Sequence, residues 1–374
     1  MLCVPILKIK NGMCTHFTAT QIKWSKHMGK KQHFVPKFLL RQFSSDSRKR
    51  LISLFHLPSS QVIKGVSIKD QAYKKNIYIS GSDHSLEEYL SMVEGDTCDI
   101  INKILLDESV SLTLKEELIL KHFINLQISR TPRKIETIQG QVDKLARTAF
   151  RHDPRVKDFI NDFTIHLTSP YHFTIALALQ LTPMLFDLKI SLLKNNSEQS
   201  VLLGQHPAII TNPFLYWKTL IGSKQGLALK GTLILLPISP NYVIALYDKQ
   251  RYSLTDFVKI GILSQEDINK INLFQFCYTT DCIYFHDDND EKINFDEYKN
   301  KTEKFRTNDK NIIRILEGKN KKGLRSEILQ STSREPAITP KFEFLALKVK
   351  AIFEDLGPTM RDLARDEVRH LLRK

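Results

Sequence analysis

The spacing of apolar residues divides the chain into a helical part and a strand-rich part. Apolar residues recur every three to four positions through most of residues 85–195, as in helices that bury one face. This spacing predicts helices over residues 85–105, 113–130, 133–152, 154–163 and 170–195, the last one bent or broken near Pro183. A layer of long helices is therefore expected.

Short runs rich in β-branched and aromatic residues lie on both sides of this helical region. Residues 51–57 and 62–68 predict a hairpin. Residues 200–203, 208–211, 231–236, 242–247 and 282–285 predict further strands, with a helix over residues 264–274. The predicted fold class is α+β: a long-helix layer packed on a mainly antiparallel sheet built from residues 51–68 and 200–285, with C-terminal amphipathic helices appended.

Changes in pattern predict the domain organisation. Residues 1–29 lack a regular period and are expected to be a flexible N-terminal extension, with Met28 as the natural start. Residues 30–290 are expected to form a single α+β domain. Residues 291–340 are polar and charged, which indicates a linker with some helix, and residues 341–374 predict a helical appendage interrupted at Gly357-Pro358.

The charge balance indicates the class of partner. The chain of 374 residues has 55 Lys and Arg against 41 Asp and Glu, a net charge of +14. Such a field favours partners of negative charge, among which nucleic acid is the commonest. The alternative is that a Lys-rich surface only keeps the protein in solution. A nucleic acid or another polyanion is the predicted partner, and the pattern does not indicate an oligomeric state.

Cysteine usage and hydropathy predict a cytoplasmic protein without membrane association. The five cysteines form no C-x-x-C pair, which argues against a disulfide framework or a zinc ribbon and favours a reducing compartment. No apolar run reaches the roughly 18–20 residues that span a bilayer. The first residues also lack the basic region and cleavage site of a signal peptide.

Recognised phosphate and metal motifs do not identify a cofactor. The chain has no G-x-x-x-x-G-K-[ST], G-x-G-x-x-G or G-x-S-x-G segment. The acidic run at residues 286–291 lacks the glycine and ligand positions of a calcium loop and is expected to be a solvated turn. The cofactor therefore stays unknown, and no metal ligand is predicted.

An ordered set of short blocks resembles a bacterial family of unknown function. The blocks are His33-Phe34-Val35-Pro36 with Leu39, Leu40 and Phe43, then Leu86-Glu87, Val93-Glu94-Gly95, residues 128–133, residues 206–210, residues 236–240 and Ile271-Asn272. In this order they resemble the DUF4238 family over residues 30–290. The resemblance implies an organisation but no reaction. Gln205-His206-Pro207 departs from the Ser-Asp that it leads us to expect before the proline step, so an acid with a role in relatives would be missing here.

Four residues are candidates for catalysis: His33, Glu94, Arg130 and His206. A histidine before a helix can act as an acid or base, or can simply fix the start of the helix. Glu94 and Arg130 are charges within apolar stretches, which are costly unless paired. They form either a structural ion pair or a polar site shared with His33 and His206.

Polar residues in or beside the blocks are candidates for binding: Arg41, Arg133, Asn212 and Asn272. An R-x4-6-H spacing, found in one helical ribonuclease superfamily, also occurs at Arg147–His152, Arg50–His56 and Arg365–His370, at about the frequency that chance gives.

Two classes of function remain open. One is a nuclease-like enzyme, an effector in bacterial defence (including anti-phage) or toxin systems. The other is a non-enzymatic module that binds nucleic acid or protein through a basic surface and the C-terminal helices. A single cleft holding His33, Glu94, Arg130 and His206 would favour the enzyme, and dispersal of these residues would favour the binding module.

Overall fold

The computed structural model describes residues 8–9, 30–79, 83–217, 225–255, 260–307, 311–319, 325–333, 336, 338–353 and 360–371. Apart from β1 (Lys8–Ile9), which pairs with β6 (Ile165–His166), the predicted extension and the start at Met28 lie outside the described residues. Gly357-Pro358 lies outside them as well.

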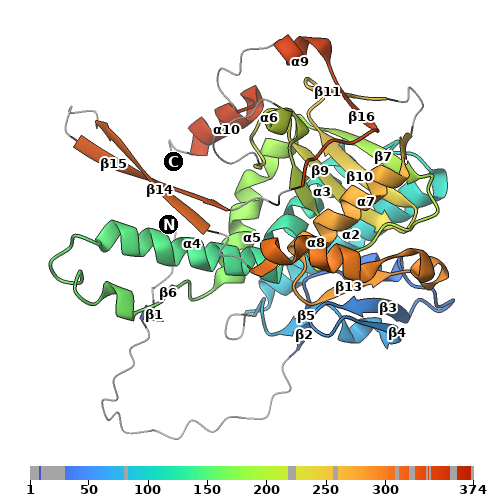
Figure 1. Ribbon diagram of the computed structural model, residues 1–374, viewed down its shortest axis with the longest axis horizontal. Helices are drawn as coiled ribbons and strands as arrows, with labels where there is room; N and C mark the ends of the chain where they lie inside the picture. Colours follow the sequence, from blue (N-terminus) through green and yellow to red (C-terminus); the bar gives the residue numbers. More distant parts are fainter. Residues whose placement is uncertain are drawn as a thin grey trace, which may run out of the picture.

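A mainly antiparallel sheet forms the centre of the molecule (Figure 1). Within the described residues it has five strands, in the order β12 (Gly261–Leu263), β7 (Lys189–Asn195), β10 (Tyr242–Tyr247), β9 (Leu233–Ser239) and β8 (Ile209–Thr211). Only β12 and β7 run parallel. A mainly antiparallel sheet is confirmed, with β7 as an addition from the region predicted to be helical. The prediction that residues 51–68 and 200–285 build one sheet is wrong, because residues 51–67 and 282–285 pair in a separate three-stranded sheet.

Alternate residues of the central strands enter two different cores. Ile234 and Leu236 of β9 belong to a core shared with the long helices. Leu233 and Leu235, between them, belong to a second core on the opposite face. Because successive side chains of a strand point to opposite faces, a strand that is apolar throughout is buried on both sides.

Long helices cover one face of this sheet: α2 (Ser85–Asp107), α3 (Leu114–Ser129) and α5 (Pro170–Leu181). Helix α4 (Pro132–Phe150) follows α3 and extends away from the sheet (Figure 1). The bounds of α2, α3 and α4 are close to those predicted. Thr113 begins α3 with a capping box, in which its hydroxyl accepts from the Glu116 amide and the Glu116 carboxylate accepts from the Thr113 amide. Long helices packed on a mainly antiparallel sheet confirm the α+β class.

The block that begins at His33 lies beside a second, smaller sheet. Short helix α1 (Lys37–Arg41) follows β2 (Lys31–His33), which pairs with β5 (Tyr73–Lys75). The predicted hairpin is confirmed as β3 (Leu51–His56) and β4 (Gln61–Ser67), and β13 (Cys282–Phe285) pairs with the other edge of β3. Helix α7 (Gln265–Tyr278) packs between the two sheets, with Ser264 as its cap.

Two predicted helices are wrong. Residues 154–163 form turns and a short 3-10 helix, Ile160–Asp162. Residues 170–195 do not form one helix, because α5 ends at Leu181, a 3-10 turn (Thr182–Leu185) follows, and residues 189–195 form β7. Proline at position 183 favours the end of the helix, and β10 then supplies backbone partners for the apolar run. Residues 200–203 are extended but contribute only a single bridge, Leu203 to Tyr284.

The last quarter of the chain packs against elements that precede it in the sequence. Helix α8 (Phe295–Thr307) packs Phe295 and Tyr298 into a third core beneath the small sheet. Strand β16 (Leu345–Leu347) pairs with β11 (Tyr252–Leu254), and α9 (Val349–Phe353) and α10 (Asp362–Leu371) follow. The domain boundaries proposed at residues 290 and 340 stay predictions.

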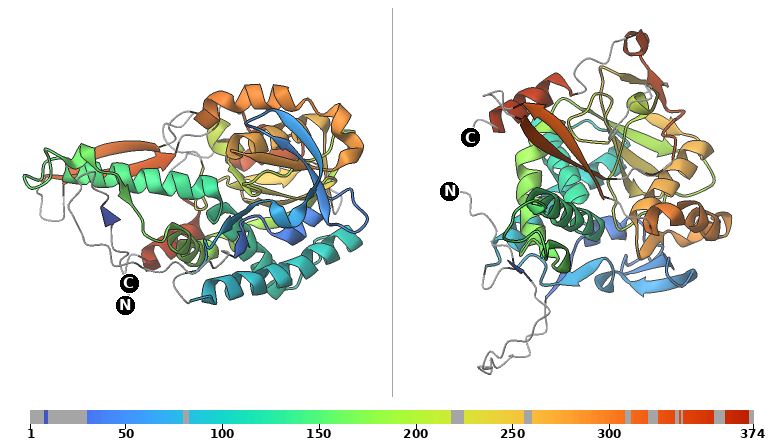
Figure 2. Two further views of the ribbon diagram at one scale, coloured as in Figure 1. Left: turned by 90° about the horizontal axis from the view of Figure 1, so that it is seen from below. Right: turned by 60° about the vertical axis from the view of Figure 1, so that its left-hand side comes forward.

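A hairpin absent from the sequence prediction accompanies α4. Strands β14 (Asn311–Lys319) and β15 (Arg325–Ser333) pair with each other, and the Lys144 ammonium donates to the Asn311 carbonyl at 2.8 Å. Figures 1 and 2 show the hairpin and α4 extending together away from the sheets. Within the described part of the chain, no helix combines the length and the apolarity needed to cross a bilayer.

Candidate functional site

Arg130 and Glu94 form an ion pair between α3 and α2. The guanidinium Nη1 lies 2.7 Å from Glu94 Oε1, and the Arg130 side chain is only 1% exposed. With its amide oxygen facing Arg130, Gln127 also accepts from Nε at 3.0 Å. The pairing meets the requirement that a buried charge be compensated, as expected from the apolar context of both residues.

Tyr78 connects this ion pair with the His33 strand. Its amide donates to Gln32 Oε1 at 2.7 Å, and its ring meets Tyr171 edge-on at 5.8 Å. Burial raises the pKa of Tyr78, and the nearby Arg130 guanidinium opposes that rise. Tyr78 therefore stays a neutral phenol beside the guanidinium. Its hydroxyl is also 3.4 Å from the His33 carbonyl oxygen.

The His33 side chain itself points into an apolar and cationic setting. Burial is the main cause that lowers the pKa of His33 to about 4, with Lys37 and Lys31 adding to the effect. Its ring lies 5.9 Å from the Tyr73 ring, and its Nε2 is buried without a hydrogen-bond partner. His33 is thus a neutral imidazole near pH 7.

His206 packs against the start of α4, where it contacts Thr131, the residue that follows Arg130. Its Nδ1 is 2.6 Å from the Thr131 hydroxyl, and that hydroxyl also accepts from the Lys134 amide. The Thr131 hydroxyl therefore joins the His206 ring to the first turn of α4. Burial, then the charges of Lys134 and Arg133, lower the pKa of His206 to about 3.

The buried, neutral state of His206 predicts a loss of stability in acid. The unfolded chain takes up a proton near pH 6.5, whereas the folded protein does so only near 3. The contribution of neutral His206 to the free energy of unfolding is therefore fully present above pH 6.5, and it is lost as the pH falls toward 3. By pH 5 the loss is about 2 kcal/mol.

We expect His206→Gln to reduce this pH dependence, measured by urea unfolding at pH 7 and pH 5. His152→Gln, at an exposed position, is the control and should keep the wild-type slope. Equal slopes for wild type and His206→Gln would contradict the assignment.

Three cations gather at the beginning of α4. Arg133 is 5% exposed, stacks 5.0 Å above the Phe305 ring, and has a buried Nη1 without a hydrogen-bond partner. Lys134 follows it, and Arg306 of α8 is close enough to lower the pKa of Arg133, which burial in the first place reduces to about 10. Glu136 and Glu303 lie near enough to oppose the lowering of the pKa of Arg133 and of Arg306, respectively, but among the described residues neither carboxylate forms a salt bridge with the three cations. We call Arg133, Lys134 and Arg306 the cationic cluster.

The cationic cluster makes the first turn of α4 electrostatically unusual. The first turns of α2, α3 and α7 contain acidic residues, which suit the positive end of the helix dipole. The first turn of α4 contains none and instead has Arg133 and Lys134. Positive charge is therefore concentrated in this turn, and Glu136 and Glu303 offset it only in part.

The other binding candidates lie elsewhere. Arg41 is exposed in the last turn of α1. Asn212 is buried, accepts from the Leu215 amide at 2.9 Å and donates to the Lys230 carbonyl at 2.9 Å. Asn272 is buried and holds residues 200–202 through the Leu202 amide and the Ser200 carbonyl. The two asparagines thus fix loops, and only Arg133 belongs to the cationic cluster.

The R-x4-6-H spacing does not produce a joint Arg–His site. Arg147 is held by Asp143 at 2.9 Å and by the Ile160 carbonyl at 3.1 Å, while His152 is exposed. Arg365 pairs with Asp362. Within the described residues, no group of three or more His, Cys, Asp or Glu side chains is placed to hold a metal ion.

Of the four catalytic candidates, the structure brings Glu94 and Arg130 into contact. His206 reaches this ion pair only through the adjacent Thr131, and His33 only through Tyr78. Sequence reasoning missed Tyr78, Gln127, Lys134 and Arg306. Lys134 had a usable signal, since two adjacent cations at a predicted helix start are uncommon there. Arg306 had none, because it comes from a helix distant in sequence.

The comparisons with known proteins confirm the resemblance found in the sequence. A family model described as "Protein of unknown function (DUF4238)" matches residues 31–289. No curated protein matches the chain. No solved structure matches it either.

Proposed function

We propose that this chain, which belongs to the DUF4238 family of proteins of unknown function, binds the phosphate backbone of nucleic acid at the cationic cluster. The observation that carries the proposal is the buried Arg133 guanidinium, which has an unpartnered Nη1 beside two further cations. A buried donor without an acceptor is costly, and a phosphate oxygen would satisfy it. The phosphate would thus supply the negative charge that the first turn of α4 lacks.

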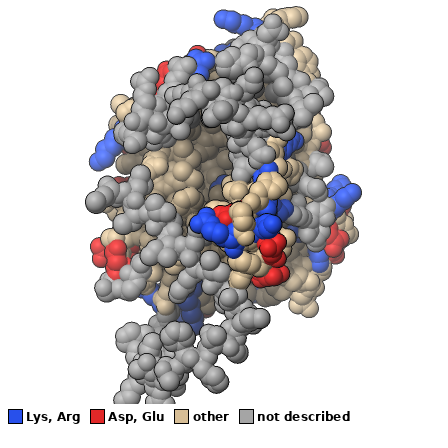
Figure 3. All heavy atoms as spheres, turned by 90° about the vertical axis from the view of Figure 1, so that its left-hand side faces the viewer, with Lys and Arg blue, Asp and Glu red and all other residues tan. Residues whose placement is uncertain are grey.

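The local cluster supports this proposal better than the overall surface does. The net charge of +14 attracts any polyanion. On the face that carries α4 and the hairpin, however, Lys and Arg lie beside Asp and Glu rather than in one continuous patch (Figure 3). A continuous basic patch on this face therefore does not support binding. Three cations that converge around the first turn of α4, with Glu136 and Glu303 offsetting them only in part, form a more specific phosphate site.

A nuclease reaction finds less support in the geometry. General acid–base catalysis is most efficient when the catalytic pKa lies near the working pH. The pKa values of His33 and His206 are lowered to about 4 and about 3, so both are weak bases and neither supplies a proton near pH 7. The dispersal of the four candidates also favours a binding module. Nuclease activity and cell toxicity that survived alanine at His33 or Arg130 would exclude these residues from catalysis.

The binding proposal predicts a salt-sensitive complex that depends on the cationic cluster. The probes are a fluorescein-labelled mixed-sequence RNA strand and the matching DNA strand, single and duplex, measured by fluorescence anisotropy. The double variant Lys134→Gln/Arg306→Gln should weaken binding about tenfold and reduce the slope of log affinity against log salt by about one to two. Arg133→Lys should weaken binding while keeping the charge, since it removes the planar fork.

A matched control separates site from net charge. Lys115→Gln/Lys157→Gln removes two exposed cations outside the cluster and should change affinity less than threefold. Equal losses in both double variants would indicate nonspecific attraction and contradict the proposed site. No salt-dependent binding of any of these probes would overturn the function itself. Circular dichroism spectra confirm that each variant is folded.

A further inference from the structure

A second polar site is a cavity beside the first turn of α3. The Arg130 ion pair lies at the other end of the same helix. The cavity has a volume of about 450 Å³ and is bounded by the α2–α3 loop, the segment leading into β7 and the β10–β11 turn. Val110, Leu112 and Phe186 contribute apolar surface, and Asp187, Lys189 and Lys249 contribute charge. This volume is in the range of small-molecule sites.

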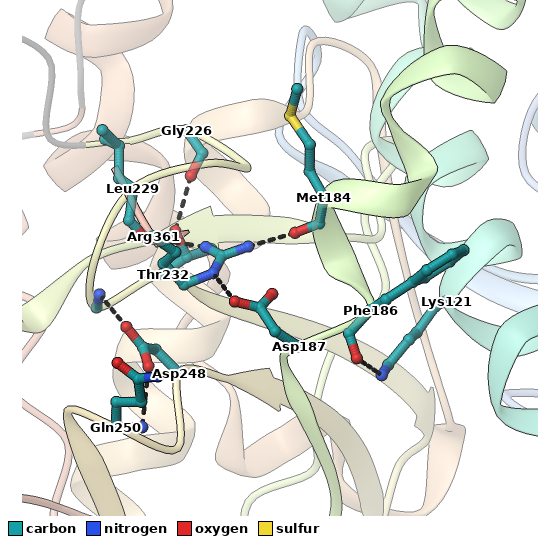
Figure 4. Close-up of polar contacts among 11 residues, drawn as sticks. Lys121, Met184, Phe186, Asp187, Gly226, Leu229, Thr232, Asp248, Gln250 and Arg361 are labelled. Atoms are coloured by element: carbon teal, nitrogen blue, oxygen red, sulfur yellow. Dashed lines mark hydrogen bonds and ion pairs between the residues drawn. The ribbon is translucent and has the colours of Figure 1, made fainter. Parts of the chain in front are cut away.

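Asp187 presents an unused hydrogen-bond acceptor here. One carboxylate oxygen, Oδ2, accepts from Arg361 Nε at 2.8 Å. The other, Oδ1, is buried and has no hydrogen-bond partner. Figure 4 shows the carboxylate joined to Arg361 through one oxygen only. Because a buried oxygen without a donor is unfavourable, this atom can accept from a ligand.

The cavity also has an excess of positive charge. Its two carboxylates are already paired, Asp187 with Arg361 and Glu117 with the buried Lys121. Lys189 and Lys249 are exposed at the cavity, and among the described residues neither ammonium has an ion-pair partner. Two uncompensated ammonium groups favour a ligand with an anionic group.

We propose that this cavity binds a free amino acid with an apolar side chain. Its carboxylate would lie between Lys189 and Lys249, its ammonium would donate to Asp187 Oδ1, and its side chain would contact Val110 and Phe186. A ligand with only the acid would leave Asp187 Oδ1 unsatisfied, and one with only the amine would leave both lysines uncompensated. The inference is independent of the nucleic-acid proposal, because it uses none of the residues of the cationic cluster.

Titration calorimetry with the full chain tests the ligand class. The probes are L-leucine, L-valine, L-methionine and L-phenylalanine at millimolar concentrations. For the best of these, the deaminated acid and the decarboxylated amine serve as analogues, and each should bind at least tenfold more weakly. Failure of all four amino acids to bind saturably would overturn the proposal. Equal affinity for either analogue would also overturn it.

Variants locate the binding. Lys249→Gln should weaken binding at least fivefold, and Val110→Trp should abolish it by filling the cavity. Lys350→Gln, an exposed position outside the cavity, is the matched control and should leave affinity unchanged. Binding that persists unaltered in both Lys249→Gln and Val110→Trp would place the ligand elsewhere and contradict the assignment. Since both changes are near the surface, thermal unfolding can confirm that the variants fold.

Discussion

Glu94→Ala should lower the free energy of unfolding by about 2–3 kcal/mol, because it leaves the Arg130 guanidinium buried without its carboxylate. Breaking a fully buried pair from one side costs about 3–5 kcal/mol. Glu94 is 26% exposed, so solvent reaches the site and the lower end of that range applies. Gln127 and Tyr78 remain near the guanidinium and limit the loss further.

Urea unfolding of two further variants distinguishes an unpaired charge from a lost contact. The double variant Glu94→Leu/Arg130→Met should recover most of the loss, because it removes both charges from the apolar surroundings. Asp96→Ala, an exposed change on the same helix, should stay within about 0.5 kcal/mol of wild type. A double variant no more stable than Glu94→Ala would show that packing, rather than the buried charge, sets the effect.

The Arg130 ion pair could be predicted from sequence because its signal is local. Each charge lies within an apolar helical stretch, and the two helices are neighbours along the chain. The physical requirement that buried charges be paired then leaves few choices. The wider hypothesis, a polar site shared with His33 and His206, required contacts across several elements. In the structure, Tyr78 lies between His33 and the ion pair, and Thr131 lies between His206 and the ion pair.

The error at residues 189–195 has a different origin. Ile190, Leu192 and Leu193 fit a helical stripe as well as a buried strand, because a short apolar run does not fix the period. In the fold, Leu192 enters the first core and Leu193 the second, which only a strand allows. The partner strand β10 is distant in sequence, so tertiary pairing decided the structure and local propensity did not.

The two candidate sites also differ in how much of each could be predicted from local sequence. Arg133 and Lys134 could be identified as a pair of cations at a helix start, but Arg306 and Phe305 arrive from α8, within the stretch predicted to be a linker. The cavity at Asp187 is even less visible in sequence. It joins three segments that are far apart in the sequence. Asp187 Oδ1 is left unpaired because Arg361, from a fourth segment, donates to Oδ2.

Arg361→Ala should lower the free energy of unfolding by about 3 kcal/mol and release the segment from Met360 onward. The Arg361 side chain is 4% exposed and joins three elements. Its Nε donates to Asp187 Oδ2, Nη1 donates to the Leu229 carbonyl at 2.9 Å, and Nη2 donates to the Met184 carbonyl (Figure 4). Removal leaves one partly buried carboxylate and two carbonyls without a charged donor, each costing about 1 kcal/mol.

This side chain fixes the residue before α10 to Met184, Asp187 and Leu229, so we expect its loss to loosen α10 before it unfolds the whole protein. The Arg361 amide also donates to the Ala228 carbonyl and Met360 forms an isolated bridge with Leu229, but such backbone contacts outside a sheet open more readily than those of the core. Limited proteolysis should therefore cut the variant near α10 under conditions in which the wild type is resistant. Arg365→Ala, whose side chain pairs with the exposed Asp362, is the matched control and should cost less than about 0.5 kcal/mol. Equal protease resistance of Arg361→Ala and wild type would mean that apolar packing, such as that of the buried Ala364, holds the helix instead.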